Sequence, residues 1–132
     1  MEEKTIKQTI MFKATPHEVY EMLMDSKKHS MFSGEDAKIS RKVGGSFSAS
    51  GSYISGTNLK LVPDKKIVQK WRGSDWDKGV YSTVTFDFKK DKAGTKLEFT
   101  QEGMPPNQRD SLSQGWKDYY WDKMKSYIEN SK

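Results

Sequence analysis

The sequence predicts an α+β domain in which a curved antiparallel sheet of about six or seven strands wraps around a long C-terminal helix. Three observations support this fold class. Apolar residues recur every three or four positions across residues 107–130, apolar and polar residues alternate from Ala37 onward, and a helix-capping motif follows an alternating stretch near the N-terminus. A sheet with one apolar face has to bury that face, and the C-terminal helix is the only predicted element long enough to cover it.

The length and composition fit one domain over residues 1–132. At 15.2 kDa the chain is long enough to bury a core unaided. It contains no cysteine, which excludes a disulfide framework, a thiolate nucleophile and a cysteine-type zinc site. No apolar run approaches the roughly 20 residues that span a bilayer, and the N-terminus lacks the apolar segment of a signal peptide. We therefore expect a cytoplasmic protein without a membrane span, and we expect it to be a monomer.

The first third of the chain predicts one strand followed by two short helices. Apolar and polar residues alternate from Ile6 to Phe12, the pattern of a strand with one buried face. Thr15-Pro16-His17-Glu18 then has the form of a capping box with proline at the first helical position. The chain bends near Asp25 and Ser26, and a second short helix is predicted over residues 26–31.

The middle of the chain predicts a series of antiparallel strands, over residues 36–41, 46–50, 53–62, 66–73, 80–89 and 95–102. Short segments rich in Gly, Pro and Asp separate them, and strands joined by short turns usually pair as neighbours. A longer loop, residues 73–79, carries Trp76 between two aspartates. The sequence has ten glycines, many in or beside these strands, which suits a strongly bent sheet.

The C-terminal helix, residues 107–130, is predicted to present one broad aromatic face. At helical spacing this face contains Leu112, Trp116, Tyr119, Tyr120, Met124, Tyr127 and Ile128. Trp121 is the exception, because it lies roughly 120° from the centre of the face at about 100° per residue. We therefore predict that Trp121 points outward or contacts another molecule.

No group of residues predicts catalysis, so we expect neither an enzyme nor a cofactor. No serine lies in a Gly-x-Ser-x-Gly elbow, and the glycines match no phosphate-binding or dinucleotide motif. Glu21, Asp25 and His29 would share one face of a continuous helix and offer three metal ligands. An exposed charged face explains them more simply, and we predict no metal site. The net charge is +5, but the lysines cluster at predicted turns without a nucleic-acid motif, so no nucleic-acid partner is expected.

Two aromatic candidate sites remain. The first is a protein-binding surface made of Lys70, Arg72, Trp76 and Trp121, because Trp and Arg dominate binding hot spots. The alternative for Trp76 is that it folds back and plugs the open end of the sheet. The second is a cavity between sheet and helix for a small, lipid-like hydrophobic ligand. Its predicted lining is Tyr20, Phe47, Trp71, Phe86, Phe99, Trp116, Tyr120 and Met124, and the alternative is that these side chains fill the space.

Two runs of sequence are specific in combination. One runs from Leu61 to Arg72 and contains Val-Pro, Ile-Val and Lys-Trp-Arg, and the other contains Gly115-Trp116 followed by Tyr119-Tyr120-Trp121. With these runs, nearly the whole chain resembles the C-terminal domain found in activators of the ATPase of the ninety-kilodalton heat-shock chaperone. The element order resembles the helix-grip fold that this domain shares with START lipid-transfer domains and relatives of the birch-pollen allergen.

The resemblance implies a non-enzymatic, co-chaperone-like role. Members of that family bind the heat-shock protein 90 chaperone and favour its closed, ATP-hydrolysing state. In full activators a separate preceding domain makes much of the activating contact, and residues 1–132 leave no room for it. The resemblance therefore implies docking on the N-terminal domains of the chaperone as the part retained here. Other helix-grip relatives instead hold lipids, hormones or polyketides between sheet and helix.

Overall fold

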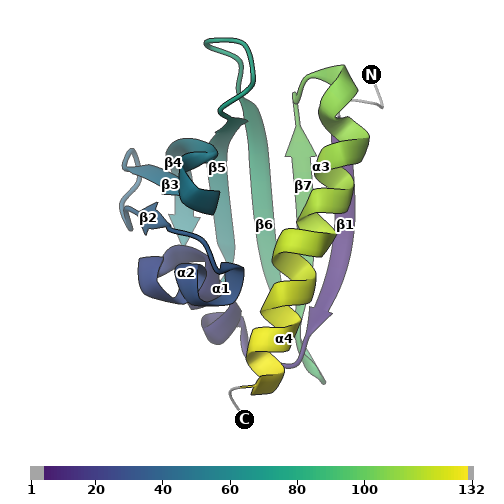
Figure 1. Cartoon of the computed structure of the whole chain (residues 1–132). Helices are drawn as coiled ribbons and strands as arrows, with labels where there is room; N and C mark the ends of the chain where they lie inside the picture. The colour runs from purple at the N-terminus through teal and green to yellow at the C-terminus, as the bar shows by residue number, and fades with distance from the viewer. Residues whose placement is uncertain (1–4, 131–132) are drawn as a thin grey trace.

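A seven-stranded antiparallel sheet curves around a long helix in the computed structural model, which describes residues 5–130 (Figure 1). The strand order is β1-β7-β6-β5-β4-β3-β2. The strands are β1 (Thr5–Phe12), β2 (Lys38–Ile39), β3 (Ser46–Ala49), β4 (Ile54–Val62), β5 (Lys66–Gly73), β6 (Ser82–Asp91) and β7 (Gly94–Glu102). This arrangement confirms the predicted helix-grip architecture.

All the helices lie on one face of the sheet (Figure 1). They are α1 (Pro16–Met24), α2 (Ser26–Ser33), α3 (Arg109–Trp116) and α4 (Asp122–Asn130), with short 3-10 turns η2 (Ser50–Ser52) and η3 (Pro106–Gln108). A π-helical segment, η4 (Lys117–Trp121), joins α3 to α4, so that the three form one continuous rod. None of the helices within residues 5–130 is both long and apolar enough to cross a bilayer.

The capping box predicted at Thr15 is confirmed. The amide of Glu18 donates to Thr15 Oγ1 at 3.1 Å, and the amide of Thr15 donates to Glu18 Oε1 at 2.8 Å. Asp25 ends α1 and caps α2, because its carboxylate accepts from the amide of Lys28 at 3.0 Å. This shared cap joins the two helices at a single residue.

The predicted strand over residues 36–41 is reduced to the two residues of β2. The side chain of Asn58 explains the early end, because its Nδ2 donates to the carbonyls of Ser40 and Lys42 at 2.7 and 3.0 Å. These carbonyls therefore bind a side chain of β4, and the carbonyl of Lys42 also accepts from the amide of Gly45 at 3.0 Å, which closes a turn. Asn58 faces inward with the same parity as Ile54 and Gly56, and the register shift that follows it, between Asn58 and Lys60, leaves Leu59 exposed.

Gly56 lies where β4 and β5 approach closely. A Cβ atom added to it would lie 1.7 Å from the carbonyl oxygen of Lys70 and 2.9 Å from Phe47 Cε1. Only glycine fits between these atoms without a backbone shift, so Gly56 sets the local curvature of this side of the sheet.

The prediction that Trp121 points outward is wrong. Only 3% of Trp121 is exposed, and its Nε1 donates to Gln8 Oε1 at 2.6 Å. The prediction assumed that each residue of the helix turns by about 100°, but the π-helical η4 places an extra residue in one turn. Trp116 and Trp121, five positions apart, consequently stack with ring centroids 5.4 Å apart. Tyr119, predicted on the buried face, is 63% exposed for the same reason.

Two glycine substitutions are expected to change stability in opposite directions. Gly56→Ala should lower the free energy of unfolding by about 2–3 kcal/mol, because the new methyl group displaces the backbone of β5. Gly115→Ala should raise it by about 0.5–1 kcal/mol, because Gly115 lies inside α3 and alanine is the better helix former. Urea denaturation measures both, and equal effects of the two substitutions would contradict the close approach at Gly56.

Candidate functional site

The interior directly between the sheet and the C-terminal helix is densely packed. The void that remains there measures about 20 Å³, which is room for about one water molecule. Of the predicted lining residues, Phe47, Trp71, Phe86, Trp116 and Tyr120 do border this void. Bulky aromatic side chains therefore fill the enclosed interior, as the alternative predicted. Three of the predicted lining residues, Trp71, Trp116 and Tyr120, also line the open groove described below.

The remaining predicted lining residues lie elsewhere. Phe99 packs against Trp116 and Trp121, with ring centroids 4.4 and 5.3 Å apart, and Met124 is completely buried. Neither borders the void. The prediction for Tyr20 is wrong, because α1 directs its ring against Phe88, with centroids 5.7 Å apart, at the far end of β6.

A chain of buried hydrogen bonds fixes Trp116 to the sheet. Its Nε1 donates to Gln101 Oε1 at 2.8 Å, Gln101 Nε2 donates to Ser82 Oγ at 2.9 Å, and Ser82 donates to the carbonyl of Trp71 at 3.0 Å. The chain joins the helix to β7, β6 and β5. Sequence analysis did not identify Gln101. The alternation of inward and outward side chains along this strand could have identified it, because Gln101 falls on the same inward-facing positions as Leu97 and Phe99.

His29 joins α2 to the C-terminal helix. Its Nδ1 lies 3.2 Å from the carbonyl of Leu23 and its Nε2 lies 3.0 Å from the hydroxyl of Tyr120. Burial lowers the pKa of His29, partly opposed by the hydrogen bond to Leu23. Burial also raises the pKa of Tyr120, partly opposed by a hydrogen bond with the Ser50 side chain. A neutral His29 therefore donates to Leu23 and accepts from Tyr120.

The three side chains considered as metal ligands have separate partners. Glu21 pairs with Arg41 at 2.6 Å, Asp25 caps α2, and His29 bonds with Leu23 and Tyr120. Among residues 5–130, no three side chains of metal-binding type come together.

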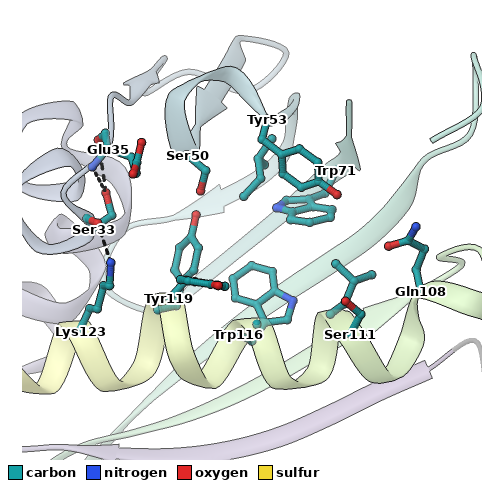
Figure 2. A pocket seen from close by; sticks show the side chains of 14 residues that line it. Ser33, Glu35, Ser50, Tyr53, Trp71, Gln108, Ser111, Trp116, Tyr119 and Lys123 are labelled. Carbon is teal, nitrogen blue, oxygen red and sulfur yellow. Dashed lines mark hydrogen bonds between the residues drawn. The ribbon is translucent and has the colours of Figure 1, made fainter. Parts of the chain in front are cut away.

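An open groove of about 460 Å³ lies beside the C-terminal helix (Figure 2). The helix forms one wall, and the segment from Ser50 to Ile54 forms the other. The groove is lined by Ser33, Glu35, Ser50, Tyr53, Ile54, Trp71, Gln108, Ser111, Leu112, Gly115, Trp116, Tyr119, Tyr120 and Lys123. Figure 2 shows Glu35, Ser33 and Lys123 at one end, aromatic rings in the middle, and Ser111 and Gln108 at the other end.

On the opposite, outer face of the sheet, two cations surround a tyrosine. Lys70 Nζ lies 4.7 Å from the ring centroid of Tyr81, and the guanidinium carbon of Arg72 lies 5.8 Å from it. Lys70 and Tyr81 are exposed and Arg72 is half-buried. We call these three residues the cation–tyrosine patch. The sequence placed Lys70 and Arg72 on the outer face correctly but did not identify Tyr81, which lies nine residues after Arg72.

Trp76 does not belong to the surface. Only 5% of it is exposed, and its ring packs on Trp71 with centroids 5.6 Å apart, as the plug alternative predicted. Arg72 holds it there by donating to the carbonyls of Trp76, Asp77 and Val80. Within the described part of the chain, Trp76 Nε1 is the only buried side-chain nitrogen or oxygen atom without a hydrogen-bond partner.

Comparison with known proteins identifies the family. Residues 13–129 match the family model described as activator of Hsp90 ATPase homolog 1-like protein. The chain belongs to this family. An activator of 90 kDa heat shock protein ATPase homolog from Dictyostelium discoideum is 37% identical over 123 residues, covering 92% of this chain and 32% of the relative. The human homolog 1 is 31% identical over 121 residues, covering 92% of this chain and 35% of the relative.

Solved structures agree with the family assignment. The crystal structure of an HSP90 activator from Plasmodium falciparum has a TM-score of 0.88 and 26% identity, with 96% of each chain covered. A protein from Mesorhizobium loti, at 20% identity and a TM-score of 0.82, shows the same fold. This member of the activator family spans about a third of the length of the curated relatives that it matches.

Replacing Trp76 and Trp116 with phenylalanine should separate packing from hydrogen bonding. Both substitutions remove the same atoms, but Trp116→Phe also leaves the completely buried Gln101 Oε1 without its donor. We expect Trp116→Phe to cost about 1–3 kcal/mol more than Trp76→Phe, which loses no hydrogen bond. Chemical denaturation measures both variants, and an equal loss would show that the Trp116–Gln101 bond contributes nothing.

Protonation of His29 at acidic pH should lower the free energy of unfolding. Its pKa is lowered in the folded protein, so the unfolded chain binds more protons below the ordinary value of 6.5. The contribution of neutral His29 to the free energy of unfolding is then fully present above about pH 6.5. It decreases as the pH falls, by up to about 1.4 kcal/mol per pH unit. Denaturation of wild type and His29→Gln between pH 7 and about pH 5 tests this. The variant should show a smaller slope, and parallel slopes would refute the assignment.

Proposed function

We propose that this chain is a non-enzymatic module that docks on a heat-shock protein 90 chaperone through the cation–tyrosine patch and stimulates the chaperone's ATPase. The observation that carries the proposal is the family membership, since relatives at 37% and 31% identity are named activators of that ATPase. In this proposal ATP hydrolysis takes place in the chaperone, and the chain acts as a cytoplasmic monomer without a cofactor.

The distribution of charge on the outer face of the sheet supports the patch as the docking surface. Three of the lysines on β5, β6 and β7 are paired with carboxylates: Lys66 with Asp87, and Lys89 and Lys96 with Glu98. Among the described residues, Lys70 and Arg72 form no ion pair. The cross-strand neighbours of Lys70 are Thr57 and Thr83, which carry no charge. Positive charge is therefore uncompensated at the patch and suits an acidic surface on a partner.

The geometry of the patch favours binding in a second way. Arg72 is fixed by three backbone carbonyls, and both cations lie against the Tyr81 ring. Side chains that are already ordered lose less conformational entropy when a partner arrives. The patch therefore presents two cations and an aromatic ring in nearly fixed positions, and Arg and Tyr are enriched at binding hot spots.

Stimulation of the ATPase requires a difference in affinity between two states of the chaperone. A module that binds the closed state more tightly than the open state shifts the population toward the closed state, and equal affinity would shift nothing. Because the chain spans about a third of the length of its curated relatives, docking is the first expectation and stimulation is the second.

Lys70→Glu is expected to weaken docking at least tenfold, about 1.4 kcal/mol, because it reverses an unpaired charge in the patch. Lys90→Glu is the matched control, with the same charge change on an exposed residue near the far end of β6. Calorimetric titration against the chaperone of the same organism gives the affinity, and a coupled assay gives the ATPase rate. Tyr81→Ala should weaken docking less than Lys70→Glu.

The outcomes separate the proposed surface from the proposed partner. If both charge reversals weaken docking equally, the attraction is a general effect of net charge and the patch is not the docking surface. If the wild-type chain neither binds the chaperone at tens of micromolar nor changes its ATPase rate, the chaperone is not the partner of this domain.

A further inference from the structure

Gly115 lies inside α3 although neither its backbone nor its surroundings requires glycine. Its φ is not positive, and an added Cβ would meet only Tyr119 Cδ2 at 3.7 Å, an ordinary contact distance. A glycine inside a helix costs about 0.5–1 kcal/mol relative to alanine. What the glycine does leave is free volume, because Gly115 lines the groove described above.

Aromatic side chains line the middle of the groove, two of them buried indoles and two of them exposed tyrosines. Trp71 and Trp116 line it with ring centroids 5.6 Å apart and an angle of 39° between their planes. Both indoles are fixed, since Trp116 is bonded to Gln101 and Trp71 packs against Trp76. On the two sides of the opening lie Tyr53 and Tyr119, 37% and 63% exposed. A volume of about 460 Å³ is within the usual range of small-molecule sites.

Opposite charges lie together at one end of the groove. Lys123 Nζ donates to the carbonyl of Ser33 at 3.1 Å, and the amide of Glu35 donates to Ser33 Oγ at 3.2 Å (Figure 2). No ion pair within residues 5–130 involves the half-buried Lys123 or the exposed Glu35, so they do not neutralise each other. The ammonium of Lys123 has two further N–H donors, and a carboxylate is an acceptor only. One end of the groove therefore offers a cation and an anion, with Ser33 between them.

We propose that this groove binds a small zwitterionic molecule with a flat apolar body, of the aromatic α-amino acid class. The carboxylate of the ligand pairs with Lys123, and its ammonium pairs with Glu35. Its ring lies between the exposed rings of Tyr53 and Tyr119, in the space that Gly115 leaves open. The proposal does not rest on chaperone docking, because the cation–tyrosine patch is on the outer face of the sheet and the groove is on the inner side.

Three matched probes test the ligand class. L-Phenylalanine has both charges, hydrocinnamate lacks the ammonium group, and phenethylamine lacks the carboxylate. Calorimetric titration of the whole chain with each probe gives the affinities, and tryptophan fluorescence, excited where the probes do not absorb, reports on the groove. We expect L-phenylalanine to bind at least tenfold more tightly than either partial analogue.

Three substitutions test the location. Lys123→Gln should abolish the preference for L-phenylalanine over phenethylamine, and Glu35→Gln should abolish its preference over hydrocinnamate. Gly115→Leu should remove binding of L-phenylalanine by filling the groove, while circular dichroism and thermal unfolding confirm that the variant is folded. Lys70→Glu is the control on the outer face and should bind L-phenylalanine as the wild type does.

Each contrary result overturns a defined part of the proposal. Equal affinity for L-phenylalanine and either partial analogue would refute the zwitterionic ligand class. Undiminished binding by a folded Gly115→Leu variant would refute the groove as the site. If L-phenylalanine and L-tryptophan both fail to give saturable binding up to their solubility limits, no amino-acid site is present.

Discussion

The burial of two stacked indoles between helix and sheet is the interaction on which the rest of the structure depends. Trp116 and Trp121 lie with their ring centroids 5.4 Å apart, and each donates its indole N–H to a glutamine, Gln101 on β7 and Gln8 on β1. These polar contacts specify how deeply and in which rotation the rod sits in the curved sheet. Apolar burial alone is non-directional and would not fix either quantity.

Because indole rings fill the interior, the side chains that a ligand or partner can reach lie on two surfaces, one on each side of the sheet. On the inner side, the helix and the segment around Ser50 leave a groove whose apolar lining includes Trp71 and Trp116. On the outer side, the strand that carries Trp71 inward carries Lys70 and Arg72 outward, because side chains alternate along β5. One strand therefore supplies both candidate surfaces, and the two point in opposite directions.

The sequence predicted the element order, the capping box at Thr15 and the inward direction of Trp71, because these follow from local periodicity and capping chemistry. It did not predict the burial of Trp121 or the exposure of Tyr119, because a π-helical segment changes the angle per residue without a local sequence signal. Burial of Trp76 depends on the hydrogen bonds that Arg72 donates to three carbonyls of the following loop. The groove and the cation–tyrosine patch likewise depend on contacts between segments distant along the chain, which periodicity cannot show.

The π-helical η4 also restricts how the length of this chain can vary. Trp116 before η4 and Met124 and Ile128 after it are all buried. The π-helical turn accommodates the extra residue in η4 and therefore keeps the buried faces of the two α-helices aligned. A one-residue deletion within η4 would remove the extra residue, restore a regular α-helix and leave Trp116 and Ile128 on the same face, whereas a deletion elsewhere in the rod would rotate every later side chain by about 100° relative to the sheet. Homologous domains should therefore accept the loss of one residue within η4, and their other insertions and deletions should be confined to the turns between strands.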